Sequence, residues 1–140
     1  MVEPWLWVVM SSPSLNDPGR WAEHKVLLLL RARGWTCLAE RWRCRFGELD
    51  LVMAKQNGVE RRLLVVEVKS RRRCGLDGWG VAACNTGKLQ RLARAMACWR
   101  MANPWTATWS MELVVALVPL PPNHKAVRWI PVVDGVNRLG

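Results

Sequence analysis

Residues 47–70 read GELDLVMAKQNGVERRLLVVEVKS, two apolar runs separated by a short polar segment. Aliphatic and β-branched residues dominate both runs, and such residues favour strands, which we predict over 47–54 and 63–70. The pair Asn57-Gly58 lies between them and is typical of a β-hairpin turn, because both residues tolerate positive φ. The segment therefore predicts two antiparallel strands that are direct neighbours in a sheet.

The polar ends of these strands fall on one face in either register that the hairpin allows. A tight turn at Asn57-Gly58 places Asp50 opposite Val65, whereas a loop two residues longer places Asp50 opposite Glu67. In both cases Asp50 shares a face with Glu67 and Lys69, because strand side chains alternate with a period of two. The other face is expected to be wholly apolar and includes Leu49, Leu51 and Met53.

The flanking sequence predicts helices and further strands around the hairpin. Asp17-Pro18 supplies a helix cap and a first-turn proline, and Gly34 a stop, so a helix is expected over 18–33. A second helix is expected over 87–102, capped by Asn85 or Thr86. Further strands are expected over 35–42, 111–118 and 127–133. The order α-β-β-β-α-β-β predicts an α/β fold with a central mixed β-sheet flanked by helices.

Length and composition suggest one domain with a basic surface. The chain of 140 residues fits a single core, which we expect over 17–140 after a loosely ordered extension at 1–16. Lys and Arg number 21 against 11 Asp and Glu, a net charge of +10 that predicts a polyanionic partner. Nucleic acid and an anionic membrane surface both fit this charge, and charge alone does not separate them.

Cysteine usage and hydropathy indicate a cytoplasmic location. Five cysteines, without a CxxC pair or regular spacing, favour reduced thiols over a disulfide framework or a zinc site. The apolar run 5–10 is too short to span a bilayer and follows Glu3 instead of a basic region. We therefore expect no membrane partner.

The clustered acidic side chains predict a bound cation. Two or three carboxylates within a few ångströms repel one another unless a proton or a metal ion is bound, and oxygen-only ligands suit Mg²⁺ or Mn²⁺. Glu48, Asp50 and Glu67 are the candidates on the hairpin.

Several ordered motifs give the chain a family resemblance. Asp50 followed by Glu67-Val68-Lys69 resembles the Asp…Glu-x-Lys core of the PD-(D/E)XK nuclease superfamily, with Leu49 where the name-giving proline stands. More narrowly, the chain resembles the YraN-like family of uncharacterised bacterial proteins over about residues 19–118. The motifs that carry this likeness are GRWAE at 19–23, WRCRFGELDL at 42–51, VEVKSR at 66–71 and the later Lys88. It departs from the family pattern at Arg41, where Asn is expected, at Asp77, where an aromatic is expected, and at Glu112, where Asp is usual.

The resemblance implies a restriction-endonuclease-like fold, related to Holliday-junction resolvases. Asp50, Glu67 and the Val68 carbonyl would hold Mg²⁺, which polarises a phosphate oxygen and lowers the pKa of a bound water. Lys69 would position that water or stabilise charge on the phosphorane. Glu23, on the first helix, is expected to complete a metal or water shell, and Glu48 to be an auxiliary ligand.

Basic side chains near these motifs are the candidates for phosphate contacts. Arg71, Arg72 and Arg73 follow the lysine directly, and Lys88, Arg91 and Arg94 recur at helical spacing. Arg43 and Arg45, in the motif before Asp50, complete the predicted nucleic-acid-binding set. Trp79, in the glycine-rich loop, is a candidate for base stacking, whereas core packing is expected for most of the ten tryptophans.

Each assignment has a purely structural alternative. Glu67 and Lys69 can form an ion pair on an exposed sheet face, and such pairs are common and weak. Glu23 is stabilised near a helix N-terminus in any case. A run of arginines is often only a solvated face.

The sequence thus ranks three functions without deciding among them. The first is a Mg²⁺-dependent endonuclease that acts on DNA, including branched or single-stranded forms, for which a symmetric homodimer is a further expectation because cutting both strands needs two sites. The second is a non-catalytic nucleic-acid-binding module that retains the nuclease fold. The third is a membrane-surface or protein-interaction adaptor that uses the basic charge alone.

Overall fold

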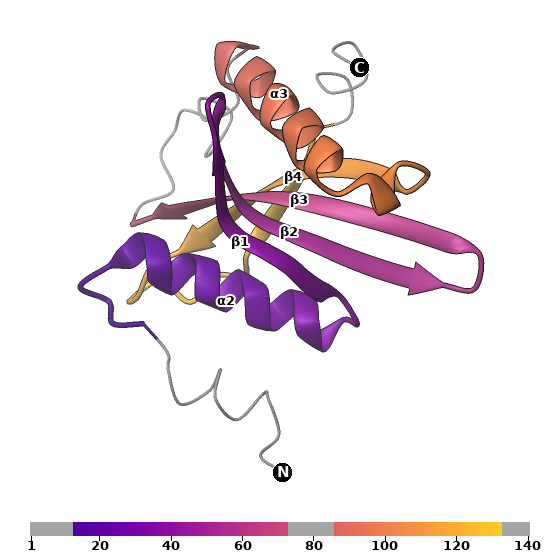
Figure 1. Cartoon of the computed structure of the whole chain (residues 1–140). Coiled ribbons are helices and arrows are strands. Elements are labelled where there is room, and N and C mark those ends of the chain that lie inside the picture. Colours follow the sequence, from indigo (N-terminus) through magenta and orange to yellow (C-terminus); the bar gives the residue numbers. More distant parts are fainter. Residues whose placement is uncertain (1–12, 73–85, 133–140) are drawn as a thin grey trace.

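A computed structural model describes residues 13–72 and 86–132, which form a mixed sheet between two helices (Figure 1). The strand order is β1-β2-β3-β4-β5, antiparallel except for the parallel pair β3 and β4. The strands are β1 (Thr36–Cys44), β2 (Gly47–Asn57), β3 (Glu60–Arg71), β4 (Ser110–Pro119) and β5 (Arg128–Pro131). The helices are α2 (Pro18–Ala32), α3 (Thr86–Ala102) and the short 3-10 helix η2 (Pro104–Thr106). The predicted α/β class and element order are confirmed.

Helix α2 begins as the sequence predicts. The Asp17 side chain accepts a hydrogen bond from the Arg20 N–H at 3.2 Å, and Pro18 occupies the first helical position, where its missing N–H has no partner to lose. The helix ends at Ala32, and Gly34 follows with a φ of 93°, a conformation that glycine adopts without strain.

The two helices cover opposite faces of the sheet (Figure 1). The core under α2 contains Ala22, Val26, Leu30, Leu51, Met53 and Val66. The core under α3 contains Leu49, Val52, Leu63, Val65, Leu92, Ala95, Met96 and Trp99. Burial of both sheet faces explains why β2 and β3 are nearly continuous apolar runs at their centres.

The β2–β3 register is the second of the two expected alternatives. Asn57 pairs with Glu60, so Gly58 and Val59 form the turn, one residue later than Asn57-Gly58. Gly58 has a φ of 57°, in the left-handed region that a two-residue hairpin turn requires. Leu51 consequently faces Val66, and Asp50 lies at the level of Glu67. The register is reached by shifting the turn and not by lengthening the loop.

The predicted apolar face is wrong at one position. Leu51 and Met53 pack under α2 as expected, but Leu49 packs on the α3 side together with Val52. The β2–β3 pairing stops at Leu51, whereas β1 and β2 stay paired as far as Cys44 and Gly47. Beyond Leu51 the β1–β2 hairpin is therefore a two-stranded ribbon, and such ribbons twist more strongly than strands inside a wide sheet. This twist carries Leu49 to the other face.

Other sequence expectations differ only in extent or lie outside the described residues. β1, β2, β3 and β4 are longer than predicted, and β5 is shorter but takes its predicted place at the sheet edge with Pro131. The extension predicted at 1–16 lies outside the described part except for 13–16, where the Asp17 N–H donates to the Ser14 carbonyl in a turn. Among the described helices, none is long and apolar enough to cross a membrane.

Candidate functional site: a carboxylate cluster at a strand fork

The site lies where β2 separates from β3. β3 continues in parallel with β4 as far as Arg71, whereas its pairing with β2 ends at Val66. The Val68 N–H, beyond this point, donates to Asp50 Oδ2 at 2.8 Å. The Asp50 carboxylate thus takes the place of a strand carbonyl and keeps this N–H from being buried unpaired.

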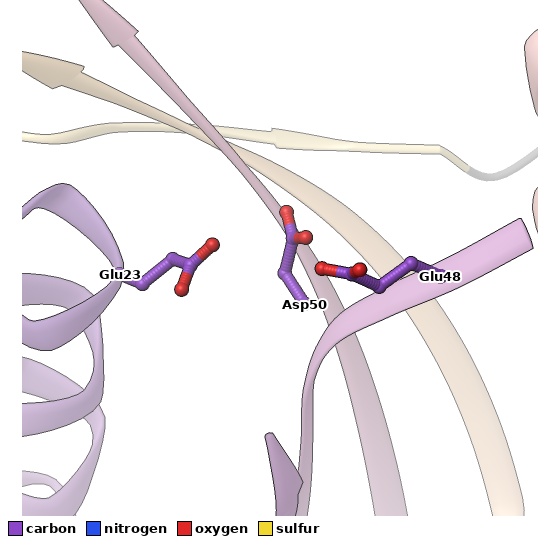
Figure 2. A group of neighbouring side chains, drawn as sticks. All are labelled: Glu23, Glu48 and Asp50. Carbon is purple, nitrogen blue, oxygen red and sulfur yellow. The ribbon is translucent and has the colours of Figure 1, made fainter. Parts of the chain in front are cut away.

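Three carboxylates from two elements converge at this fork. Glu23 projects from α2, and Glu48 and Asp50 project from β2, with the three side chains turned toward one another in Figure 2. One oxygen from each lies within 4.8 Å of one from each of the others. Glu23 is predicted for this site from the sequence, and the structure brings it together with Asp50.

Within this cluster the surroundings of Asp50 raise its pKa. Burial, first, and then the negative charge of Glu67 raise the pKa of Asp50 to about 7, and Glu23 adds to the rise. The hydrogen bond from the Val68 N–H lowers it, but not enough to offset the other effects. At neutral pH this carboxyl is therefore close to half protonated.

Glu67, predicted as the partner of Asp50, has two lysines beside it. It is the most buried carboxylate of the site, with a relative exposure of 8%. Its Oε1 lies 3.4 Å from the Lys69 Nζ and 3.1 Å from the Lys88 Nζ. A buried carboxylate needs such cations, because an unpaired charge in the interior is strongly disfavoured.

The pKa values of the two lysines are shifted in opposite directions. Burial, followed by the neighbouring Lys88, lowers the pKa of Lys69 in spite of Glu67. Burial also acts against the charge of Lys88, but hydrogen bonding to Lys69 and the charge of Glu67 raise its pKa overall. Within this pair Lys69 is thus the lysine that releases its proton more readily.

Two arginines neutralise the outer carboxylates. The Arg41 Nε lies 2.9 Å from Glu23 Oε2, and the Arg43 Nε lies 2.8 Å from Glu48 Oε2. Arg43 is predicted to contact nucleic acid. In the structure it pairs with Glu48. Within 13–72 and 86–132 no ion pair reaches Asp50.

Arg41 also has an unusual backbone conformation. Its φ is 49°, and among the described residues it is the one non-glycine residue with a positive φ. Asparagine is enriched in this left-handed region, because its short polar side chain reaches the local backbone. The Asn that the resemblance led us to expect at this position would suit this backbone, and Arg41 adopts the same conformation in its place.

The remaining predicted phosphate contacts are distributed unevenly. Arg45, Arg72, Arg91 and Arg94 are exposed, whereas Arg71 is partly buried and donates to the Ser70 carbonyl. Lys88, predicted as a surface contact, lies against Glu67 instead, because the face of α3 that bears it packs on the sheet. Arg73 and Trp79 lie outside the described residues, as does Asp77. Glu112 is remote from the fork and pairs with Arg62 at 3.2 Å.

A pocket of about 240 Å³ adjoins the fork on the α3 side. Phe46, in the turn between β1 and β2, forms part of its wall. Sequence reasoning did not single out Phe46, although it is the chain's one phenylalanine and lies inside a motif already recognised.

Comparisons with known proteins match a length of chain that contains the whole site. A family model described as "Uncharacterised protein family UPF0102" matches residues 22–117. A UPF0102 protein of Prochlorococcus marinus strain MIT 9303 is 56% identical over 116 residues, which are 83% of this chain and 89% of the relative. One of Parasynechococcus marenigrum strain WH8102 is 44% identical over 115 residues, 82% of this chain and 81% of the relative. The matched segment contains every carboxylate and lysine of the fork.

Proposed function

We propose, from the premise that this chain belongs to the uncharacterised protein family UPF0102, that it is a divalent-metal-dependent endonuclease acting on DNA phosphodiesters, branched or single-stranded forms included. Membership confirms the YraN-like resemblance seen in the sequence. The observation that carries the proposal is the position of Asp50, which is partly buried beside other carboxylates and makes no ion pair within the described residues.

The donor atoms at the fork fit a hard divalent ion. Glu23, Glu48 and Asp50 offer only carboxylate oxygens, the ligand type that Mg²⁺ and Mn²⁺ prefer. The Val68 carbonyl is a further candidate, since the N–H and C=O of one strand residue face the same side and the Val68 N–H faces Asp50. Glu67 would be a ligand from β3, where its charge already acts on Asp50.

The protein's own groups are suited to phosphoryl chemistry around such an ion. A bound Mg²⁺ or Mn²⁺ supplies Lewis acidity toward a phosphate oxygen and lowers the pKa of a bound water. Lys69, whose pKa is lowered by burial and by the neighbouring Lys88, would orient a water or stabilise negative charge on the phosphate. Lys88 holds the Glu67 side chain in place through their ion pair.

The test is cleavage of linear, single-stranded and four-way-junction DNA with Mg²⁺, Mn²⁺ or EDTA. We expect metal-dependent cleavage by the wild type and a loss of 100-fold or more, on the order of what one preorganised group contributes, in Asp50→Asn and Lys69→Ala. Glu112→Gln is the matched control, because it removes a carboxylate charge from the remote ion pair with Arg62. Cleavage that is equal in all variants, or that persists in EDTA, contradicts the proposal.

A second function is favoured by the ion pairs at the site. Glu23, Glu48 and Glu67 each have a cationic partner within the chain, so much of the acidic charge is neutralised without a metal. This favours a non-catalytic module that binds nucleic acid and keeps the fold. Salt-dependent binding without cleavage on any substrate, under any of the metal conditions, is the result expected for that module.

A further inference from the structure

The pocket beside the fork is bounded by two elements that belong to different layers. The turn Arg45-Phe46 closes the β1–β2 hairpin, and α3 lies across from it. The strong twist of this hairpin brings its tip to α3, where Phe46 packs against the α3-side core. The pocket therefore lies between the tip of this two-stranded ribbon and α3.

Its walls have contrasting chemistry. Phe46, Leu92 and Ala95 provide apolar surface, and Glu48 and Glu67 bring carboxylates from the fork. Lys88, which pairs with Glu67, also lines the pocket. A neutral aromatic ring can lie against the apolar side and turn its polar edge toward these charged groups. The volume, about 240 Å³, is below the roughly 300–1,000 Å³ typical of pockets for drug-sized ligands, so it suits a single small ring system.

Cationic side chains lie beside this pocket. Arg91 lines it from α3 and is exposed. The guanidinium carbons of Arg45 and Arg94, both exposed side chains, lie over the Phe46 ring, 4.6 Å and 5.8 Å from its centre, so a base that stacks on this ring takes the place of one of them. An aromatic ring with arginines around it is the arrangement by which proteins hold single-stranded nucleic acid, stacking a base and neutralising its backbone.

We infer that this pocket binds one unpaired nucleobase, stacked on Phe46, next to the phosphate at the fork. The inference rests on the proposed function, since Glu48 and Glu67 belong to both the pocket and the fork. A base in a continuous duplex is paired and stacked, and taking it out costs a few kcal/mol. The preferred substrate is therefore single-stranded DNA or a duplex with an unpaired nucleotide at a flap, gap or junction.

Binding without cleavage tests this directly. An oligonucleotide with 2-aminopurine is titrated in EDTA, where metal-dependent cleavage does not occur, and its fluorescence is expected to fall as the base stacks on Phe46. Phe46→Leu keeps apolar volume in the core but removes the π-face, and we expect it to weaken single-strand binding about tenfold, within the range of one lost base stack. Trp105→Ala is the control, because Trp105 is exposed and is not part of the pocket wall.

A ligand-side comparison keeps the test valid if Phe46→Leu unfolds. Wild-type protein is offered a series of single strands, each with one abasic position, and a blunt duplex of equal length at equal salt. We expect one abasic position, beside the cleaved bond if cleavage occurs, to weaken binding as Phe46→Leu does, and the duplex to bind at least tenfold more weakly than the intact strand.

The outcomes separate the two proposals. Equal affinity for abasic and intact strands, or for strand and duplex, overturns the nucleobase pocket even if the protein cleaves DNA with Mg²⁺. Stacking and abasic sensitivity in EDTA, with no cleavage in any metal, support the pocket and contradict the endonuclease.

Discussion

At the scale of single residues, the charge that Asp50 needs for its proposed role destabilises the folded protein. Its carboxylate satisfies the Val68 N–H, which an amide oxygen can also do. Its negative charge is disfavoured by burial and by Glu67 and Glu23. A position where charge is costly to the fold but the geometry is kept is typical of functional sites.

Asp50→Asn is expected to stabilise the protein at pH 8 and to leave its stability at pH 4 nearly unchanged. The folded pKa of about 7 exceeds the unfolded pKa of 3.8, so the folded state binds the extra proton between these values. The contribution of Asp50 to the free energy of unfolding is present below about pH 4 and is lost as pH rises through about 7, by up to about 4 kcal/mol. Thermal unfolding of both proteins in EDTA from pH 4 to 8 measures this. A lower melting temperature for the variant at pH 8 would contradict it.

Metal binding should depend on pH through the same carboxyl. Because a divalent ion needs the deprotonated ligand, Mn²⁺ should raise the wild-type melting temperature more at pH 8 than at pH 6 and should release protons on binding. Asp50→Asn should lose most of this Mn²⁺ effect, whereas Glu112→Gln should keep it. An equal Mn²⁺ effect in wild type and Asp50→Asn would rule out Asp50 as a ligand.

Arg41→Asn is expected to be neutral or stabilising by about 1 kcal/mol. The left-handed backbone at position 41 costs an ordinary residue about 1–2 kcal/mol, and Asn adopts it at lower cost. The substitution also removes a partly exposed ion pair with Glu23, which contributes about 1 kcal/mol or less. Arg43→Asn is the matched control, since Arg43 has an ion pair of similar geometry but no positive φ. Urea unfolding of the two variants should therefore differ in sign or size. Equal losses in both would show that φ at position 41 carries no strain.

At the scale of elements, α3 is joined to the fork by the contact between Lys88 and Glu67. This contact lies on the same helix face as Leu92, Ala95 and Met96, which are buried against the sheet. One helix thus seals the core, supplies a cation for a buried acid and forms a wall of the pocket. The functional side chains of the fork are held in place by the packing of both helices.

Lys88→Met should destabilise the protein more than the double variant Lys88→Met with Glu67→Gln. Removing Lys88 leaves the buried Glu67 with Lys69 as its one cationic partner within 13–72 and 86–132. We expect a cost of about 2–3 kcal/mol, less than the roughly 3–5 kcal/mol of fully buried pairs because Lys88 is partly exposed. Removing the acid as well takes away the uncompensated charge. A double-mutant cycle by urea unfolding gives the coupling, and additive losses would show that the pair does not stabilise the docking of α3.

At the scale of the whole molecule, some of the 21 Lys and Arg side chains are already paired and are less available to a partner. Arg41, Arg43 and Lys88 are engaged with carboxylates of the site, and Arg62 with Glu112. Exposed arginines on the β1–β2 turn and on α3 stand beside the pocket. The surface next to the fork is thus the part of the described molecule where we expect phosphate contacts.

Salt dependence of single-strand binding should locate these contacts. Each phosphate neutralised contributes about 0.7 to the slope of log affinity against log salt on single strands, so the double variant Arg91→Ala, Arg94→Ala should lower the slope by roughly 1.4. Arg62→Ala, at the other end of the sheet, should leave it unchanged. If Arg62→Ala lowers the slope equally, binding follows net charge and has no preferred surface.

The sequence by itself determined the order of helices and strands and the family. It also determined the hairpin and placed Asp50, Glu67 and Lys69 on one stretch of two neighbouring strands, because strand periodicity and turn chemistry are local properties. It did not determine that β2 pairs with β3 only from Leu51 onward, that Leu49 changes face, or that Phe46 reaches α3. Those outcomes depend on the twist of the β1–β2 ribbon once it is free of the sheet. Likewise, tertiary packing decided that Lys88 pairs with Glu67 and that arginines pair with Glu23 and Glu48. Contacts between layers depend on how the helices pack on the sheet, and residue spacing along one strand does not determine them.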